Sequence, residues 1–414
     1  MKLFTLTSDL HSELARTAAR EQFIKDIEAA MGQEFHICDA DFSSYGEAPG
    51  EEFIYVRTGG TEGIFKSLFC KDGKPAVPEP VRLLASGRSN SLAASMEILS
   101  YLNLHGVKGE ILHGSAQDIA ERILHPCVSR PSGEAPAGVL AVSPRQVLAG
   151  RRYAVIGHPS DWLISSDVDY ARAKEALGAE LIDIPMEELL SEISRHEHPA
   201  VDLPALNVPK YGRPIPASDL EQSLDIYGAL RRLTEKYSLS GLTVRCFDLL
   251  TAVHNTGCMS LALLNSEGFT ATCEGDVPAM LSMALAREVS GVSGFQVNLS
   301  RIEKGECLFA HCTVPLDMVK SWVYDTHFES GIGVAVHGEM EPGPATLFKL
   351  SPDCSRMFVR EVGLVCNRYG DKLCRTQVVV KGEGLDDYFL RCPIGNHHII
   401  IPGHRAGDLE ILLS

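Results

Sequence analysis

The chain has 414 residues, of which 45% are hydrophobic and 22% are charged, a composition typical of a globular protein with two or three domains. Its net charge of −16 argues against nucleic acid or an anionic membrane as a general partner, and no apolar run is long enough to span a membrane. Twelve cysteines are scattered without a CxxC pair, and the N-terminus lacks a signal-peptide pattern. We therefore expect reduced thiols in a cytoplasmic protein.

The first third of the chain alternates short apolar runs with longer amphipathic segments. We predict strands at 53–60, 81–87 and 109–114, and helices at about 8–30 and at 91–102. Strands that alternate with helices in this way form βαβ units around a parallel sheet. Gly59 and Gly60 follow the first of these strands without a complete phosphate-binding fingerprint, so we expect a tight turn there.

A proline-rich stretch at 126–149 separates this unit from a second unit of the same kind. Its predicted strands are at 151–162, 179–185 and 242–248, and its predicted helices are at 165–178, 217–237 and 258–266. The unit closes with FTATCEGDVPAMLSMALAREVSG at 269–291, where a short strand reaches Glu274 and a helix follows. Asp276 is placed to cap that helix, and Pro278 suits its first turn.

After about residue 290 the chain changes to short alternating or β-branched runs divided by glycine, proline and aspartate. Such runs predict an antiparallel β domain, either a barrel or a sandwich. We therefore predict an α/β protein with two doubly wound (Rossmann/flavodoxin-like) domains followed by an antiparallel β-barrel-like C-terminal domain. The expected bounds are 1–143, 144–290 and 291–414.

A few oxygen and nitrogen ligands follow predicted strands: Glu274, His311 in LFAHCTVP, and the pair His397-His398 in GNHHIIIPGH. One carboxylate and two imidazoles suit a divalent ion such as Mn²⁺, with positions left for substrate oxygens. Two residues also have a structural alternative: Asp276 would serve only as a helix cap, and His311, which lies among apolar residues, would be a core histidine with satisfied hydrogen bonds. Because neighbouring strand residues face opposite sides, at most one of His397 and His398 is expected to be a ligand.

Three of these segments resemble the L-fucose isomerase/L-arabinose isomerase family. The segment CEGD with its following helix is similar to the family's metal-binding glutamate, GNHHIIIPGH to its C-terminal histidine motif, and FAHCTVP to the segment that supplies a further metal histidine. The order of the three domains is also similar. The resemblance implies that Glu274 is a metal ligand and acid/base, that His397 is a metal ligand with His398 as its rival, and that His311 binds the metal or the substrate.

At one position this sequence differs from the family's pattern. The family's second metal-binding acid corresponds to Asn298 here; an amide oxygen can ligate a hard cation weakly but cannot relay a proton. We therefore keep Asn298 as a candidate metal ligand and catalytic position, and the second proton-transfer task would pass to Asp276, to a metal-bound water, or to no group at all. His404, which closes the histidine motif, and Arg57 are predicted to bind the substrate.

By this resemblance we predict a Mn²⁺-dependent aldose–ketose isomerase that acts on a small sugar through an enediolate and assembles as a homo-oligomer, either trimer or hexamer. Glu274 would move the proton between C2 and C1. A catalytically altered or inactive sugar-binding homologue is the alternative, because Asn298 stands in place of the second acid. A metal-dependent epimerase or lyase needs the same base and the same chelated intermediate, and it remains a third hypothesis.

Overall fold

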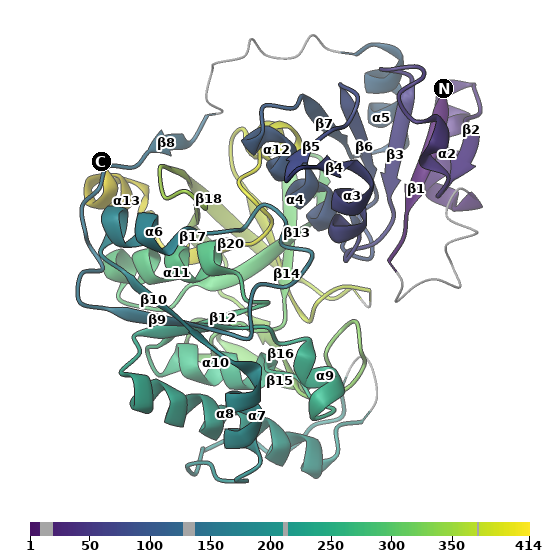
Figure 1. The fold of residues 1–414 in the computed structure, drawn as a ribbon. Coiled ribbons are helices and arrows are strands. Elements are labelled where there is room, and N and C mark those ends of the chain that lie inside the picture. The colour runs from purple at the N-terminus through teal and green to yellow at the C-terminus, as the bar shows by residue number, and fades with distance from the viewer. Residues whose placement is uncertain (9–19, 127–136, 210–213, 371) are drawn as a thin grey trace.

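The computed structural model describes residues 1–8, 20–126, 137–209, 214–370 and 372–414. In these residues the chain forms two parallel β-sheets with flanking helices and one closed antiparallel barrel (Figure 1). The α/β class and the C-terminal barrel are therefore as predicted. Part of the helix predicted at 8–30 lies outside the described residues, and the described part is α2 (Gln22–Met31).

The N-terminal sheet has the order β2-β1-β3-β6-β7, and its strands are parallel. This is the order of flavodoxin-like doubly wound sheets, which bind ligands at the carboxyl ends of their strands. Every residue of β3 and β6 is buried, as expected for strands with helices on both faces. The elements are β1 (Lys2–Leu6), β2 (His36–Asp39), η3 (Phe42–Ser44), β3 (Glu52–Val56), α3 (Glu62–Phe69), β4 (Cys70–Lys71), β5 (Lys74–Pro75), β6 (Val81–Ala85), α4 (Ser91–Leu104), β7 (Gly109–Leu112) and α5 (Ala116–Leu124).

The second sheet, with the order β10-β9-β11-β12, is also parallel. Helices α8 and α10 have the predicted bounds, whereas α6 begins later than the predicted residue 165. The carboxylate of Asp169 accepts the N–H groups of Ala171 and Arg172, so the cap lies there and not at the earlier serines. The elements are β9 (Arg152–Ile156), α6 (Tyr170–Leu177), β10 (Glu180–Ile184), α7 (Met186–Ile193), α8 (Ala217–Tyr237), β11 (Gly241–Val244), α9 (Asp248–Ala252), α10 (Cys258–Ser266), β12 (Thr270–Cys273) and α11 (Val277–Ser290).

The barrel follows the order β17-β20-β13-β14-β19-β18, and pairing of β17 with β18 closes it. The short strand β8 (Val139–Ala141) joins the outer edge of β18, although it lies in the stretch predicted as the end of the N-terminal domain. The remaining elements are β13 (Phe295–Glu303), β14 (Glu306–His311), η4 (Leu316–Met318), β15 (Ser321–Asp325), β16 (Ala335–Glu339), β17 (Gly343–Leu350), β18 (Arg356–Arg368), β19 (Thr376–Lys381), α12 (Leu385–Arg391), β20 (His398–Pro402) and α13 (Ala406–Leu413).

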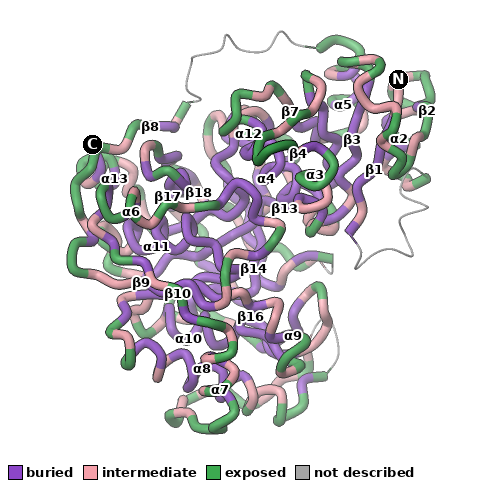
Figure 2. The backbone as a smooth tube through the Cα atoms, viewed as in Figure 1, coloured by how far each residue is buried: buried purple, intermediate pink, exposed green. Residues whose placement is uncertain are grey.

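Two buried helices join the barrel to the sheets. Residues 91–102 of α4 and 277–286 of α11 are buried (Figure 2), as expected for helices that are covered on all sides. Apolar side chains of α11 pack in one cluster with Phe348 of β17 and with Ile399 and Ile401 of β20. This packing sets the carboxyl end of β12, where α11 begins, beside the barrel.

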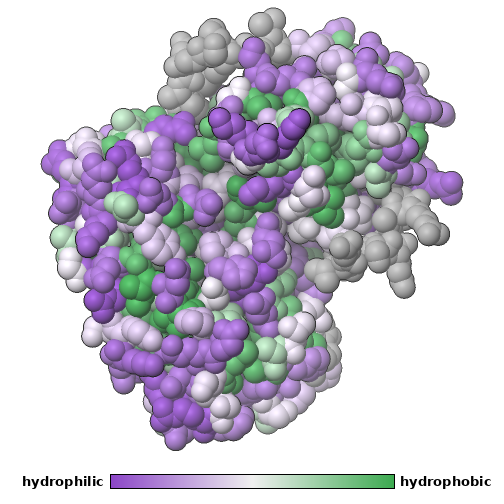
Figure 3. All heavy atoms as spheres, viewed as in Figure 1, coloured by the Kyte–Doolittle hydropathy of each residue, from purple (hydrophilic) through white to green (hydrophobic). Residues whose placement is uncertain are grey.

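The outer surface carries both hydrophobic and hydrophilic residues. On the face drawn in Figure 3, hydrophobic residues lie in small areas separated by hydrophilic ones. Of the helices in the described part of the chain, none is both long enough and apolar enough to cross a membrane. The described cysteines are free thiols.

His113 links the N-terminal sheet to the barrel. Its Nδ1 lies 2.7 Å from the Ala85 carbonyl oxygen, and its Nε2 accepts the Ile302 N–H at 3.0 Å. A carbonyl only accepts and an N–H only donates, so this geometry requires the neutral imidazole with its proton on Nδ1. Burial lowers the pKa of His113 from 6.5 to about 4.

We expect this histidine to make the free energy of unfolding fall as the pH is lowered from 6.5 to about 4. Between these two pH values the unfolded chain binds a proton at His113 and the folded chain does not, so protonation favours unfolding. Above pH 6.5 His113 is neutral in both states, and it then causes no loss of stability. The full loss corresponds to about 3 kcal/mol. Urea unfolding at several pH values would measure it. His113→Leu should be less stable at neutral pH but should show a weaker pH dependence, and identical slopes for both proteins would contradict the prediction.

Candidate metal centre

Glu274 stands in a strained turn at the end of β12. The φ angles of Glu274 and Gly275 are 66° and 69°, a left-handed conformation that costs energy for a residue with a side chain. A Cβ at Gly275 would lie 2.5 Å from the His158 carbonyl oxygen, so glycine is required there. The turn is held by hydrogen bonds from Ser160 N–H to the Glu274 carbonyl and from Gly275 N–H to the Val244 carbonyl, each 2.9 Å long.

The Glu274 carboxylate is oriented by two neighbours. Trp162 Nε1–H donates to Oε2 at 2.5 Å, and His397 Nε2 lies 3.4 Å from Oε1. Trp162 was not among the predicted site residues. Its signal was weak: it is one of two tryptophans in the chain and stands at the end of the stretch predicted as strand 151–162.

Three of the predicted residues converge on one point. A ligand atom from each of Glu274, His311 and His397 lies within 4.8 Å of the others, and all three residues are buried. The imidazole rings of the two histidines are 5.5 Å apart. His311 Nδ1 pairs with the Thr313 hydroxyl at 2.8 Å, and His397 Nδ1 pairs with Asp276 at 2.9 Å. Each ring therefore has one nitrogen held by a partner and Nε2 left for a ligand, as metal-binding histidines do.

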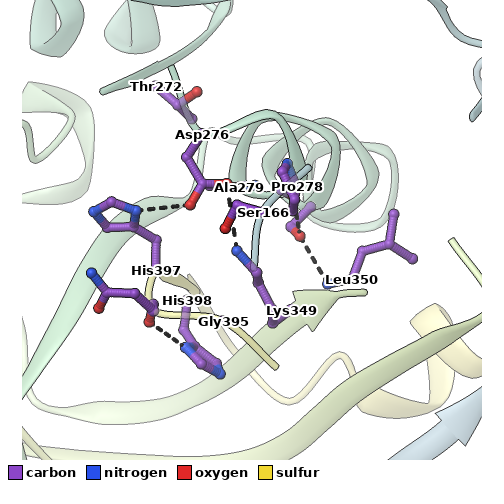
Figure 4. Close-up of polar contacts among 12 residues, drawn as sticks. Ser166, Thr272, Asp276, Pro278, Ala279, Lys349, Leu350, Gly395, His397 and His398 are labelled. Carbon is purple, nitrogen blue, oxygen red and sulfur yellow. Dashed lines mark hydrogen bonds and ion pairs between the residues drawn. The ribbon is translucent and has the colours of Figure 1, made fainter. Parts of the chain in front are cut away.

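Asp276 lies behind this cluster. Its carboxylate accepts the Ala279 N–H at 2.6 Å as the cap of α11, contacts His397 Nδ1, and lies 3.6 Å from Lys349 Nζ. Figure 4 shows Asp276 between the imidazole of His397 and the ammonium group of Lys349. Asp276 is fully buried, so the structure places it as a helix cap and a partner of His397. Lys349 was also missed, although a lysine in the apolar run ATLFKLS was a possible signal.

The charges in the cluster depend on one another. Burial raises the pKa of Asp276, but Lys349 and His397 outweigh it and bring that pKa to about 2. Burial opposes the charge of His397, whereas Glu274 and Asp276 raise its pKa to about 10. For His311, burial and the neighbouring His397 lower the pKa to about 4. The carboxylates of Glu274 and Asp276 therefore favour the protonated form of His397, and a metal ion bound at Nε2 would have to displace that proton.

Asn298 also fits a cation site. Its Oδ1 is buried and has no hydrogen-bond partner within the described structure. Strand alternation puts Asn298 on the same face of β13 as Gln296. Gln296 Oε1 accepts the N–H of Cys273, the residue before Glu274, at 2.8 Å. A buried acceptor without a partner calls for an explanation, and a hard cation is a suitable partner for an amide oxygen.

The structure does not bring the other predicted residues into the cluster. His398 pairs with Tyr388 Oη and with the Asn396 carbonyl, each at 2.9 Å, and burial lowers its pKa to about 3. Its position agrees with the expectation that only one of the two neighbouring histidines reaches the site. His404 is half exposed and lies 3.4 Å from Glu361. Arg57 forms an ion pair with Glu21 of the N-terminal α/β unit.

Comparison with known proteins gives one partial likeness. No protein-family model matches the chain. Over 141 residues it is 26% identical to the sulfoquinovose isomerase of Clostridium sp. (strain MSTE9), a match that covers 33% of this chain and 30% of that protein. The chain thus spans less than a third of the length of the curated relative it matches. This weak similarity supports a relationship to sugar isomerases.

Proposed function

We propose that the protein is a metal-dependent aldose–ketose isomerase, with Mn²⁺ or another divalent cation as its cofactor. The observation that carries the proposal is the convergence of Glu274, His311 and His397, with one imidazole nitrogen of each histidine left for a ligand. The partial similarity to a sugar isomerase supports the reaction class. A homo-oligomeric state stays a prediction.

Glu274 is the base in this proposal. A divalent cation held by Glu274, His311 and His397, with Asn298 as a weaker ligand, would polarise the C1 and C2 oxygens of an open-chain sugar. The Glu274 carboxylate takes the proton from C2 and returns it to C1, while the proton of the C2 hydroxyl passes to the C1 oxygen through a water molecule. Trp162 fixes the plane of that carboxylate through its 2.5 Å hydrogen bond, which keeps the base in one orientation during transfer.

Asp276 is a positioning residue in the same proposal. It has no exposed surface, so it supports His397 from behind and does not contact the sugar. By accepting a hydrogen bond from His397 Nδ1–H, it fixes the tautomer that presents Nε2 to the metal. Asn298 cannot take over proton transfer, because an amide does not titrate in this range.

Deuterium exchange tests the proposal directly. We expect the protein, stripped with a chelator and reloaded with Mn²⁺, to introduce solvent deuterium at C2 or C1 of at least one aldose–ketose pair, and EDTA to stop the exchange. The panel should include pentoses, hexoses, 6-deoxyhexoses and their 6-phosphorylated and 6-sulfonated forms. Metal-dependent sugar binding without exchange would favour the sugar-binding alternative that Asn298 suggests. Cleavage products would indicate a lyase.

A further inference from the structure

A cavity of about 230 Å³ lies between the N-terminal sheet and the barrel. Its lining contains three cationic side chains and, among the described residues, no carboxylate; the lining residues are Gly87, Arg88, Arg301, Gly370, Lys372 and Leu373. Asp371 lies outside the described residues. In a chain with a net charge of −16, three cations around one cavity form a local site for negative charge.

The cations come from three separate segments. Arg88 lies in the turn between β6 and α4, Arg301 lies on β13, and Lys372 lies between β18 and β19. A Cβ at Gly87 would be 2.8 Å from Arg301 Nε, so the missing side chain leaves room for the guanidinium group. In the described structure Arg301 has one ion-pair contact, a loose one with Glu303 at 3.9 Å, which contributes little at the surface.

A β-bulge directs Arg301 to the metal-centre face of β13. Asn298 pairs with Ala310, Leu299 with Phe309 and Arg301 with Leu308, so Ser300 is the extra residue. The extra residue shifts the alternation by one, and Arg301 takes the same face as Asn298. The path along the strand from Asn298 to Arg301 is about 10 Å, comparable to an extended six-carbon sugar with a terminal substituent.

A second contact ties the cavity to the metal centre. Asn90, which follows Arg88 in the same turn, donates from Nδ2 to Glu329 Oε1 at 2.5 Å. Glu329 is exposed, and the nearby negative charge of Glu274 acts to raise the pKa of its carboxyl group. The turn that carries Arg88 therefore lies on the same side of the molecule as Glu274.

We infer that this cavity is a subsite for a strongly anionic group, such as a sulfonate or phosphate, at the far end of the sugar whose C1–C2 end lies at the metal centre. The inference rests on the proposed function and names its substrate class. Guanidinium groups match the oxygens of such anions, and hydrogen bonds to a charged partner are stronger than neutral ones.

Calorimetric titration of the metal-free protein tests the subsite without turnover. The ligands are glucose, glucose 6-phosphate, 6-deoxy-6-sulfoglucose and inorganic phosphate. We expect the two anionic sugars to bind at least about tenfold more tightly than glucose. Arg301→Gln and Arg88→Gln should each remove most of that preference, whereas Lys304→Gln, which removes an exposed charge just after β13, should retain it.

The outcomes separate this inference from the proposed reaction. Equal binding of neutral and anionic sugars would overturn the subsite, and so would variants that keep the full preference while their thermal unfolding is unchanged. Inorganic phosphate that binds as tightly as glucose 6-phosphate would also overturn it, because the cavity would then hold a free anion. A preference for anionic sugars in a protein that exchanges no deuterium would support the subsite and leave only the isomerase proposal refuted.

Discussion

Replacing Glu274 with glutamine is expected to lower the metal-dependent exchange of the sugar C2 proton by about 10²- to 10⁴-fold, the range for loss of a general base. Glutamine keeps the shape of the side chain and can still accept from Trp162 Nε1–H. It loses the negative charge that faces His397 Nε2 at 3.4 Å and the basicity needed to take a proton. The affinity for Mn²⁺ should fall as well, because a neutral amide replaces a carboxylate ligand.

Two measurements separate these effects for Glu274→Gln. Titration with Mn²⁺, followed by electron paramagnetic resonance, reports metal affinity, and deuterium exchange at saturating metal reports the base. Glu383→Gln is the matched control, because Glu383 lies in the turn between β19 and α12 and is exposed, so both quantities should stay at the wild-type level. A Glu274→Gln protein with undiminished exchange at saturating Mn²⁺ would rule out Glu274 as the base.

The fold was predictable where the determinants are local. Helices α8 and α10 match the predicted 217–237 and 258–266, because their apolar periodicity is carried by consecutive residues. The closure of the barrel is different. It depends on the pairing of β17 with β18 and of β17 with β20, and runs of alternating residues do not specify which strands pair.

The site was predictable to a similar extent. Glu274 could be found from its strand, turn and helix, and the resemblance singled out His311 and His397. His397 and His398 differ in their hydrogen-bond partners: His397 pairs with Asp276 beside the metal centre, whereas His398 pairs with Tyr388. Trp162 reaches Glu274 across 112 residues of chain, and such a contact leaves no pattern in one sequence.

Lys349 is the buried cation behind the site. Its side chain has no exposed surface, and its Nζ, 3.6 Å from Asp276 Oδ1, has no hydrogen bond in the described structure. Gly395 lies beside both Lys349 and Glu97: a Cβ there would be in ordinary contact with Lys349 Nζ at 3.7 Å and with Glu97 Oε2 at 3.5 Å. The charge of Lys349 lowers the pKa of the Asp276 carboxyl and that of the Glu97 carboxyl. For Glu97 burial is the larger effect, and its pKa is raised overall. One ammonium group therefore balances two buried acids.

Lys349→Met is expected to reduce the free energy of unfolding by about 3–5 kcal/mol, because removing one partner of a buried ion pair leaves the other charge uncompensated. Methionine is similar in length to the aliphatic part of lysine, so the loss should be mainly electrostatic. Urea unfolding of the metal-free protein would measure it. Lys381→Met, at the exposed end of β19, is the matched control and should change stability little.

A double variant tests the interaction between the two side chains. The loss of unfolding free energy in Lys349→Met with Asp276→Asn should be smaller than the sum of the losses in the two single variants, because Lys349 and Asp276 interact. A Lys349→Met protein as stable as the wild type would show that Asp276 and Glu97 do not depend on this cation.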